Sequence, residues 1–165
     1  MAFWLMLQKA EQRRKGCQNL RYTLLDLESY DIVQEGKIPL PKKTTLTWLG
    51  FTSDGVSFLS HPHDDRSPYT KAPAVFDTSG LLSILDRHRR PNQGRWVPLL
   101  DTTSLARDGR KEGYWPVGVS ATHLSCVLLK GLETEPSFPK PLIQEVELHM
   151  PMLNMDNQQG KLEER

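Results

Sequence analysis

Short runs in which hydrophobic and polar residues alternate recur along most of the chain, separated by turn-forming residues. The clearest run extends from Thr44 to Phe51, where threonines alternate with leucine and tryptophan. A side-chain period of two is typical of a β-strand with one buried face. Comparable runs predict further strands at residues 20–27, 32–33, 74–77, 81–85, 95–100, 114–119, 123–129 and 143–148. Short strands at spacings of about ten residues favour an all-β meander, sandwich or propeller over a βαβ fold.

Turn signals group several of these runs into hairpins. Ser53-Asp54-Gly55 predicts a turn between the run at 44–51 and a partner strand at 56–59. Thr78-Ser79-Gly80 predicts a second turn, between residues 74–77 and 81–85. Pro98 interrupts its run and therefore indicates an edge strand or a bulge.

The two ends of the chain differ in composition from the centre. Residues 1–16 contain an apolar stretch followed by charged residues that favour helix, so they predict a short helical segment. Residues 156–165 are polar and predict a tail without packing. We therefore expect one β-domain over residues 17–155, preceded by an unrelated segment at 1–16.

Four large aromatic residues lie within the apolar runs. Because aromatic side chains fill the space between packed sheets, we expect them in the structural core. They are Trp48, Phe51, Trp96 and Trp115.

The charge balance excludes one class of function. Among 165 residues, 21 are Lys or Arg and 20 are Asp or Glu, so the formal net charge is +1. Such a chain has no overall positive field with which to hold DNA. No apolar run approaches the roughly 20 residues of a membrane span, so no membrane partner is expected. The two cysteines, Cys17 and Cys126, predict free thiols in a reducing compartment.

One local cluster of basic residues remains as a candidate contact site. It contains Arg87, Arg89, Arg90 and Arg95, with Trp96 beside it. Arginine binds phosphate through two parallel hydrogen bonds, and tryptophan can stack on a base. A solvated loop or a protein contact is the alternative interpretation of the same cluster.

Candidate catalytic and metal sites are weak. His61, His63, Asp64 and Asp65 are possible metal ligands, but Pro62 stiffens the spacing and neighbouring side chains in an extended loop point apart, so we expect a polar surface loop from His61 to Pro73. Asp101, Ser120 and His123 could form a triad on paper, yet the chain contains no nucleophile, phosphate-binding or zinc-protease motif. Cys126 lies in an apolar run and predicts a buried thiol. We expect no enzyme, no metal and no cofactor.

A series of longer motifs resembles one known family over about residues 17–165. In order, the motifs are NLRYTL at 19–24, LTWLGFTSDG at 46–55, DTSGLLSILD at 77–86, RWVPLLDT at 95–102, YWPVGV at 114–119, LLKG at 128–131 and FPKP at 138–141. They resemble the middle, second-propeller domain of the minichromosome loss protein family. This family is also known as chromosome transmission fidelity protein four or acidic nucleoplasmic DNA-binding protein one. The fungal branch is the most similar.

The resemblance implies a DNA-replication adaptor without enzymatic activity, located in the nucleus. In this family a six-bladed propeller follows a WD-repeat propeller and precedes a helical bundle. The middle propeller forms a homotrimer, and the bundle binds peptides from the GINS-containing replicative helicase and from DNA polymerase alpha. Chromatin association and sister-chromatid cohesion follow indirectly from these contacts.

At about 40 residues per blade, the chain has room for three to four blades. We therefore expect a partial β-propeller that lacks the bundle and does not bind client peptides directly. The alternative is a small β-rich module that contacts nucleic acid through the basic loop.

Overall fold

The structure, a computed structural model, describes residues 3–9, 18–55, 71–87, 92–106, 109–137 and 142–148. These residues form an all-β fold with one short 3₁₀ helix, as the alternating pattern predicts. The elements are β1 (Phe3–Lys9), β2 (Leu20–Asp26), β3 (Ile32–Lys37), β4 (Leu46–Gly55), β5 (Lys71–Asp77), β6 (Leu81–Asp86), β7 (Arg95–Asp101), η1 (Thr102–Leu105), β8 (Glu112–Val119), β9 (His123–Lys130) and β10 (Ile143–Glu147).

The N-terminal segment is a strand where the composition predicts a helix. β1 pairs antiparallel with β2 over its whole length, from Phe3 opposite Asp26 to Lys9 opposite Leu20. Its side chains alternate, so that Leu5 is buried while Trp4 and Met6 are exposed. The helix prediction is wrong because pairing with a neighbouring strand outweighs the small differences in intrinsic helix propensity.

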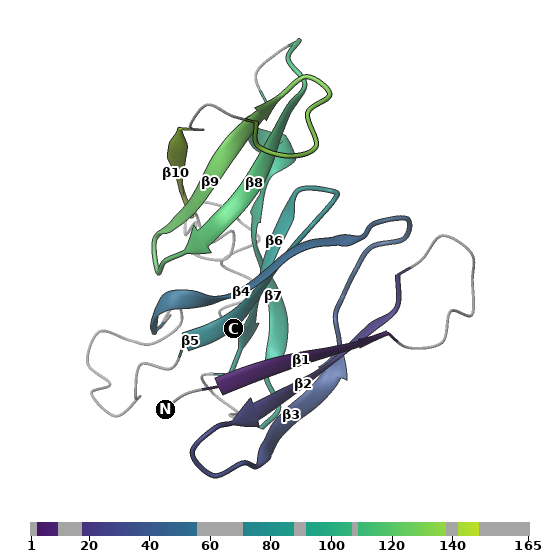
Figure 1. The fold of residues 1–165 in the computed structure, drawn as a ribbon, viewed down its shortest axis with the longest axis vertical. Helices are drawn as coiled ribbons and strands as arrows, with labels where there is room; N and C mark the ends of the chain where they lie inside the picture. Colours follow the sequence, from purple (N-terminus) through teal and green to yellow (C-terminus); the bar gives the residue numbers. More distant parts are fainter. Residues whose placement is uncertain are drawn as a thin grey trace, which may run out of the picture.

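The strands form a sheet of three strands, β1–β3, and a sheet of seven strands in the order β10-β9-β8-β4-β5-β6-β7. The parallel pair of β4 with β8 divides the larger sheet, and we call the three antiparallel units that result blades. The first blade contains β1–β3, the middle blade β4–β7 and the last blade β8–β10. Figure 1 shows them one after another along the long axis, with the last blade at the top and the first at the bottom. Consecutive antiparallel strands in each unit are the architecture of propeller blades.

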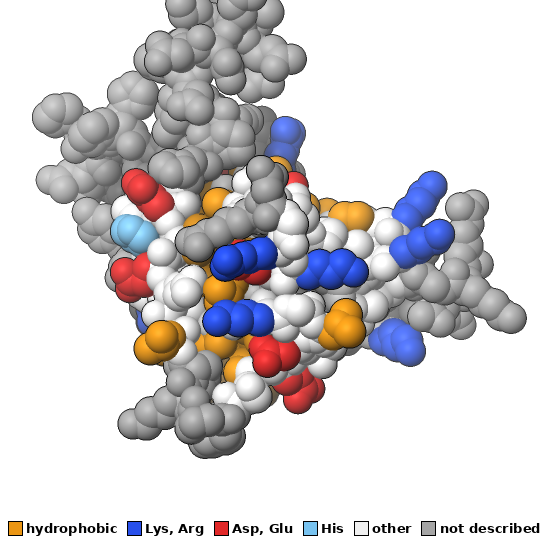
Figure 2. All heavy atoms as spheres, turned by 90° about the horizontal axis from the view of Figure 1, so that it is seen from above, with side chains coloured by type: hydrophobic (Ala, Val, Ile, Leu, Met, Phe, Trp, Pro, Cys, Tyr) orange, Lys and Arg blue, Asp and Glu red, His pale blue; other side chains and the backbone are white. Residues whose placement is uncertain are grey.

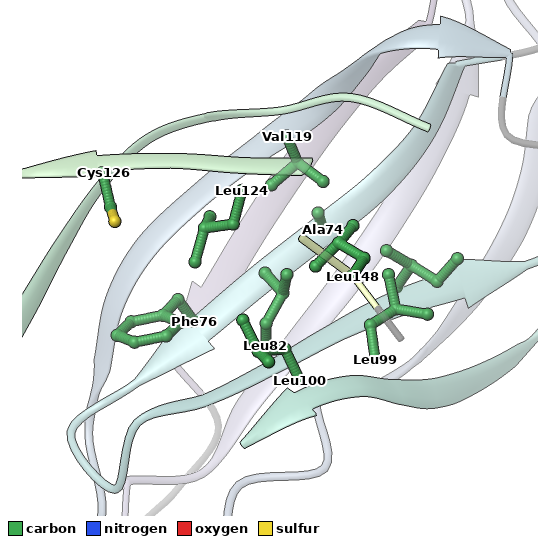
Figure 3. Close-up of a cluster of buried hydrophobic side chains, with 10 residues drawn as sticks. Ala74, Phe76, Leu82, Leu99, Leu100, Val119, Leu124, Cys126 and Leu148 are labelled. Carbon is green, nitrogen blue, oxygen red and sulfur yellow. The ribbon is translucent and has the colours of Figure 1, made fainter. Parts of the chain in front are cut away.

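Two hydrophobic clusters join the blades, one on each face of the middle blade. Ala74 and Phe76 of β5 face the last blade, where they pack near Leu124 and Cys126 (Figure 3). Val75, between them in sequence, packs instead with Leu24 of the first blade. Because successive strand residues point to opposite faces, β5 and β6 need an almost continuous apolar sequence to serve both clusters.

A single parallel contact connects the strands of the middle and last blades. Thr52 of β4 pairs with Val119 of β8, and both residues are buried. β4 and β8 are the first strands of their blades. In a propeller the blades repeat around a central channel, so the equivalent strands of neighbouring blades point the same way. The parallel pairing of β4 with β8 agrees with this arrangement. The described chain is therefore a partial β-propeller.

One predicted hairpin turn is confirmed and the other is wrong. Residues 78–80 join β5 to β6, and Gly80 adopts a φ of +86° that favours glycine. The carboxylate of Asp77 accepts hydrogen bonds from the backbone N–H and the hydroxyl group of Ser79. At residues 53–55, in contrast, β4 continues through Gly55, opposite Lys71. The turn prediction is wrong because β4 pairs again with β5 at Gly55. The strand expected at 56–59 lies outside the described residues.

The interpretation of Pro98 is confirmed on both counts. β7 is the edge strand of its sheet, and the register of its pairing with β6 shifts next to Pro98. A proline lacks the N–H that an interior ladder needs, so an edge position with a bulge accommodates it. Within the described ranges, the only helix is the four-residue η1, and none is long enough to cross a bilayer.

Candidate interaction surfaces

The basic cluster is only partly described, and its first member turns inward. The guanidinium carbon of Arg87 lies 4.9 Å from the centre of the Phe3 ring, a cation–π contact between the middle and first blades. Burial lowers the pKa of Arg87, while the nearby Tyr22 and Asp26 act in the opposite direction. Arg95 on β7 is exposed, whereas Arg89 and Arg90 lie outside the described residues. Arg87 therefore contacts the first blade through Phe3. A phosphate or protein contact of the basic cluster stays a prediction.

A second polar contact joins the same two blades. The amide nitrogen of Gln34 on β3 donates to the carbonyl of Gly94, at 2.9 Å, and its amide oxygen accepts from the backbone N–H of Gly94, at 2.8 Å. A Cβ at position 94 would lie 2.8 Å from the carbonyl oxygen of Asp86, so any larger residue requires the backbone to shift. This paired contact fixes the distance between β3 and the loop before β7. We call it the Gln34–Gly94 clamp.

Tyr22 and Trp96 lie next to the clamp. The Gln34 amide also donates to the Tyr22 hydroxyl, at 2.7 Å, and the ring of Tyr22 meets Trp96 edge to face with centres 5.4 Å apart. Burial raises the pKa of Tyr22, and the hydrogen bond from Gln34 partly opposes that shift. The buried indole nitrogen of Trp96 has no hydrogen-bond partner within the described part of the chain. These contacts form a blade-to-blade interface and show no geometry for binding a ligand.

The predicted aromatic core divides into two groups. Trp48 packs against the cluster between the middle and last blades, and Phe51 and Trp96 pack against the cluster between the first and middle blades. All three are partly buried. Trp115 is also partly buried but belongs to neither cluster, because its position on β8 places it on the face of the last blade that turns away from the middle blade.

The residues of the hypothetical triad are held in separate local contacts. The carboxylate of Asp101 accepts from the N–H of Thr103, at 3.0 Å, where it caps η1. Ser120 bonds with the backbone of His123, and the His123 ring lies 2.7 Å from the Thr122 hydroxyl. These bonds stabilise a helix start and a hairpin turn, so they give no support to a charge relay.

The remaining chemical candidates carry no reactive geometry. Burial raises the pKa of the Cys126 thiol to about 11, so the sulfur is protonated at neutral pH and a poor nucleophile. Across the described ranges, no group of three or more His, Cys, Asp or Glu side chains could hold a metal ion. The polar loop with His61, His63, Asp64 and Asp65 lies outside those ranges.

Charge on the surface is mixed. Figure 2, which looks onto the molecule from the last-blade end, shows Lys and Arg side chains across the centre and on the right, with Asp and Glu side chains at the left and just below the central cations. Phosphate binding by a duplex needs several cations gathered along one surface. The described part of this face does not show that arrangement.

Hydrophobic side chains instead mark the two outer faces of the blades. On the first blade, Trp4 is 61% exposed and Ile32 is 59% exposed. On the last blade, Ile143 is 61% exposed, and Trp115 lies on the same face. The sequence analysis did not predict these faces. The outer face of the first blade could have been predicted from the alternation of Phe3, Leu5 and Leu7 with Trp4 and Met6.

The chain matches a known protein family over almost its whole length. The family model described as "Minichromosome loss protein, Mcl1, middle region" matches residues 2–152. The chain belongs to this family. The match confirms the resemblance, and it also includes most of the segment at 1–16 that the sequence motifs left aside.

Individual relatives agree with the family. The chain is 33% identical over 138 residues to Minichromosome loss protein 1 of Schizosaccharomyces pombe, covering 82% of this chain and 15% of the relative. It is 26% identical over 154 residues to WD repeat and HMG-box DNA-binding protein 1 of Xenopus laevis, covering 91% and 12%. It is 34% identical over 86 residues to DNA polymerase alpha-binding protein of Saccharomyces cerevisiae, covering 48% and 9%. The family member described here thus spans 15% or less of the length of each of these relatives.

Proposed function

We propose that this chain is a non-enzymatic structural module of a nuclear DNA-replication adaptor. The observation that carries the proposal is the family match over residues 2–152. One aligned relative is named for binding DNA polymerase alpha, and another is named for minichromosome loss. In the proposed role, the adaptor links the replicative helicase to DNA polymerase alpha on chromatin and supports sister-chromatid cohesion.

The architecture supports a scaffolding role for these blades. Propeller blades pack through broad apolar faces. The two hydrophobic clusters join the blades in this way, and the Gln34–Gly94 clamp adds a polar contact between the first and middle blades. Peptide capture by a helix-in-groove mode needs a groove between packed helices. Within the described residues there is only the short η1, so we assign client binding to other parts of the adaptor. The homotrimer implied by the resemblance belongs to the same proposal.

A domain exchange tests this role. In Minichromosome loss protein 1 of S. pombe, the aligned 138-residue segment is replaced by the corresponding residues of this chain, and the rate of minichromosome loss is measured. We expect the hybrid to retain chromosomes, and a second hybrid carrying Gly94→Val to lose them because the clamp cannot close. A well-expressed hybrid that loses minichromosomes as fast as a deletion strain would contradict the proposal.

A direct binding measurement tests the assignment of client sites. Labelled peptides from the helicase and from DNA polymerase alpha are titrated with this chain, and fluorescence anisotropy is recorded. We expect no saturable binding at micromolar concentrations of the chain. Saturable binding would show that the blades themselves carry a client site.

A further inference from the structure

Two adjacent lysines form the tip of the turn that leads into the middle blade. Residues 38–45 connect β3 to β4, and within them the backbone N–H of Thr44 donates to the carbonyl of Pro41, at 3.2 Å. The Thr44 hydroxyl donates to the same carbonyl, at 2.8 Å. Lys42 and Lys43 are the two central residues of this turn, and both are exposed. The turn, which we call the lysine turn, therefore presents two neighbouring cations at the surface.

The backbone of the lysine turn favours glycine at its second central position. Lys43 adopts a φ of +64°, in the left-handed region where any side chain strains the backbone. Within the described segments, the Lys43 side chain makes no hydrogen bond or ion pair that would offset this strain. A strained residue that gives the fold nothing in return points to a role for its side chain toward another molecule.

Three more cations lie where the strands of the first blade meet this turn. Lys9 is the last residue of β1, and Lys37 is the last residue of β3. Arg21 lies directly opposite Lys37 in the β2–β3 pairing, and like charges in that relation destabilise a sheet. All three are exposed, and none forms an ion pair with a carboxylate of the described residues.

Hydrogen bonds fix the lysine turn next to these strand ends. Lys9 lies opposite Leu20 at the start of β2, and the carbonyl of Leu20 accepts from the N–H of Ile38, at 3.0 Å. The N–H of Leu46, at the start of β4, donates to the side-chain oxygen of Gln18, at 2.7 Å. Figure 1 shows the connection from β3 to β4 projecting on the right, and Figure 2 shows Lys and Arg side chains on the same side. We call this group the basic end: Lys9, Arg21, Lys37, Lys42 and Lys43.

The carboxylates next to the basic end are already hydrogen-bonded. Glu35 lies two residues before Lys37 on β3, and its carboxylate accepts from the Thr23 hydroxyl, at 3.0 Å. Asp77 lies opposite the first residue of β4, is buried, and accepts from the N–H of Ser79, at 2.7 Å. The basic end therefore carries more cations than carboxylates, so its charge fits an anionic partner.

The extent of the basic end favours a short acidic peptide over a nucleic acid. β2 is seven residues long, so its other end lies about 20 Å away. There the β2–β3 turn carries the carboxylates of Asp26, Glu28 and Asp31. A nucleic acid lying along the blade extends its phosphate charges to these carboxylates, because its charge continues along its whole length. A short acidic peptide contacts the basic end alone.

We propose that the basic end binds an acidic peptide segment of a partner protein, with Lys42 and Lys43 at the centre of the contact. Carboxylates of the peptide pair with the ammonium groups, which the long lysine side chains carry to a flexible ligand. The lysine turn is the entry to the middle blade, which packs against a described blade on each face. This contact adds a further partner to the module and does not rest on the function proposed above.

The test titrates a short fluorescent peptide of alternating glutamate and glycine with the full chain and records anisotropy at low ionic strength. We expect saturable binding at submillimolar concentrations of the chain, weakened at physiological salt because exposed charges are screened. The double variant Lys42→Glu/Lys43→Glu should weaken binding by about tenfold or more. Lys71→Glu is the matched control, because it reverses an exposed lysine at the opposite end of the middle blade. It should change the affinity by less than about twofold.

A second variant keeps the test independent of folding defects. Lys43→Gly removes one cation and suits the positive φ, so it should raise the melting temperature while it weakens peptide binding. Absence of binding would overturn the proposal, as would equal binding of a peptide with glutamine in place of glutamate. An equal loss in Lys71→Glu would also overturn it. Tighter binding of a single-stranded oligonucleotide of the same charge would assign the basic end to nucleic acid instead.

Discussion

The middle blade and the two outer blades have the same antiparallel meander but bury different numbers of faces. β5 and β6 contribute to clusters on both sides, with Leu82 fully buried on one side and Leu85 on the other. β1 and β10 bury only one face, and their outward positions include Trp4 and Glu145. The number of packed faces therefore determines whether a strand in this chain is continuously apolar or alternates.

The largest expected effect contrasts one substitution at two depths. Leu82→Ala removes a side chain that is completely buried between the middle and last blades and leaves a cavity. We expect the free energy of unfolding to fall by about 2–5 kcal/mol. Leu132→Ala, the same change at an exposed turn, should alter it by less than about 0.5 kcal/mol. Urea titration of both variants measures the contrast, and equal losses would mean that the middle blade is not the packed centre.

The second test compares two tryptophans on the two kinds of face. Trp48 packs against the cluster between blades, so Trp48→Ala should cost about 2–3 kcal/mol, reduced from the value for a fully buried ring. Trp115 lies on the outer face of the last blade, so Trp115→Ala should cost about 1 kcal/mol in the single chain. Denaturant titration at low protein concentration compares them. A larger loss for Trp115 would reverse the assignment of inner and outer faces.

The third test removes the polar joint between the first and middle blades. Gln34→Leu leaves the N–H of Gly94 and the hydroxyl of Tyr22 without their partner, which should cost about 1–2 kcal/mol. Gln34→Glu is the control, because it keeps the acceptor for the Gly94 N–H and should lose less. Thermal unfolding of both variants ranks them; an unchanged melting temperature for Gln34→Leu would show that apolar packing alone joins the two blades.

The fourth test uses pH to probe the inner face of the last blade. Burial raises the pKa of the Cys126 thiol from 9.0 to about 11. As the pH rises, the unfolded chain loses the thiol proton before the folded chain does. The free energy of unfolding is therefore unaffected by this thiol below about pH 9, and it falls as the pH rises toward 11. We expect the free energy of unfolding to fall more steeply over that interval in the wild type than in Cys126→Ala. Parallel slopes would indicate that the thiol reaches water in the folded chain.

The smallest expected effect concerns the exposed edge of the middle blade. Arg95→Ala should change the free energy of unfolding by less than about 0.5 kcal/mol, since the side chain lies on the surface of an edge strand. If the basic loop makes no phosphate contact, the variant should also leave any weak DNA binding and its salt dependence unchanged in an anisotropy titration. A reduction of about one unit in the salt slope would support the nucleic-acid alternative.

The hydrophobic pattern predicts the strands well, because a period of two leaves a direct trace in each blade. The strand at 44–51, the hairpin at 78–80 and the edge position of Pro98 all follow from local chemistry. The helix expected within 1–16 is wrong over the described residues 3–9, because β1 takes its structure from pairing with β2, which no local propensity encodes. The turn expected at 53–55 fails for a similar reason, because pairing with β5 extends β4 to Gly55, opposite Lys71.

The interaction surfaces were less predictable than the strands. The sequence places Arg87 in a basic cluster. Its contact with Phe3 could not be predicted, because the two residues are far apart in the sequence. The clamp joins Gln34 to a glycine 60 residues away, and neither residue is distinctive by itself. The hydrophobic residues on the outer faces depend on register across the strands, which a linear pattern does not specify. The family itself was accessible from the sequence because its motifs are contiguous.

The ladders of each blade join only strands that are consecutive in the chain, and the Thr52–Val119 pair is the one ladder contact between blades among the described strands. Loop-closure entropy is small for such neighbouring strands, so each meander can form without waiting for distant residues. During synthesis the first blade can be complete while the last is still inside the ribosome. The order of folding along this chain should then be the order of translation, with the contact between β4 and β8 made at the end.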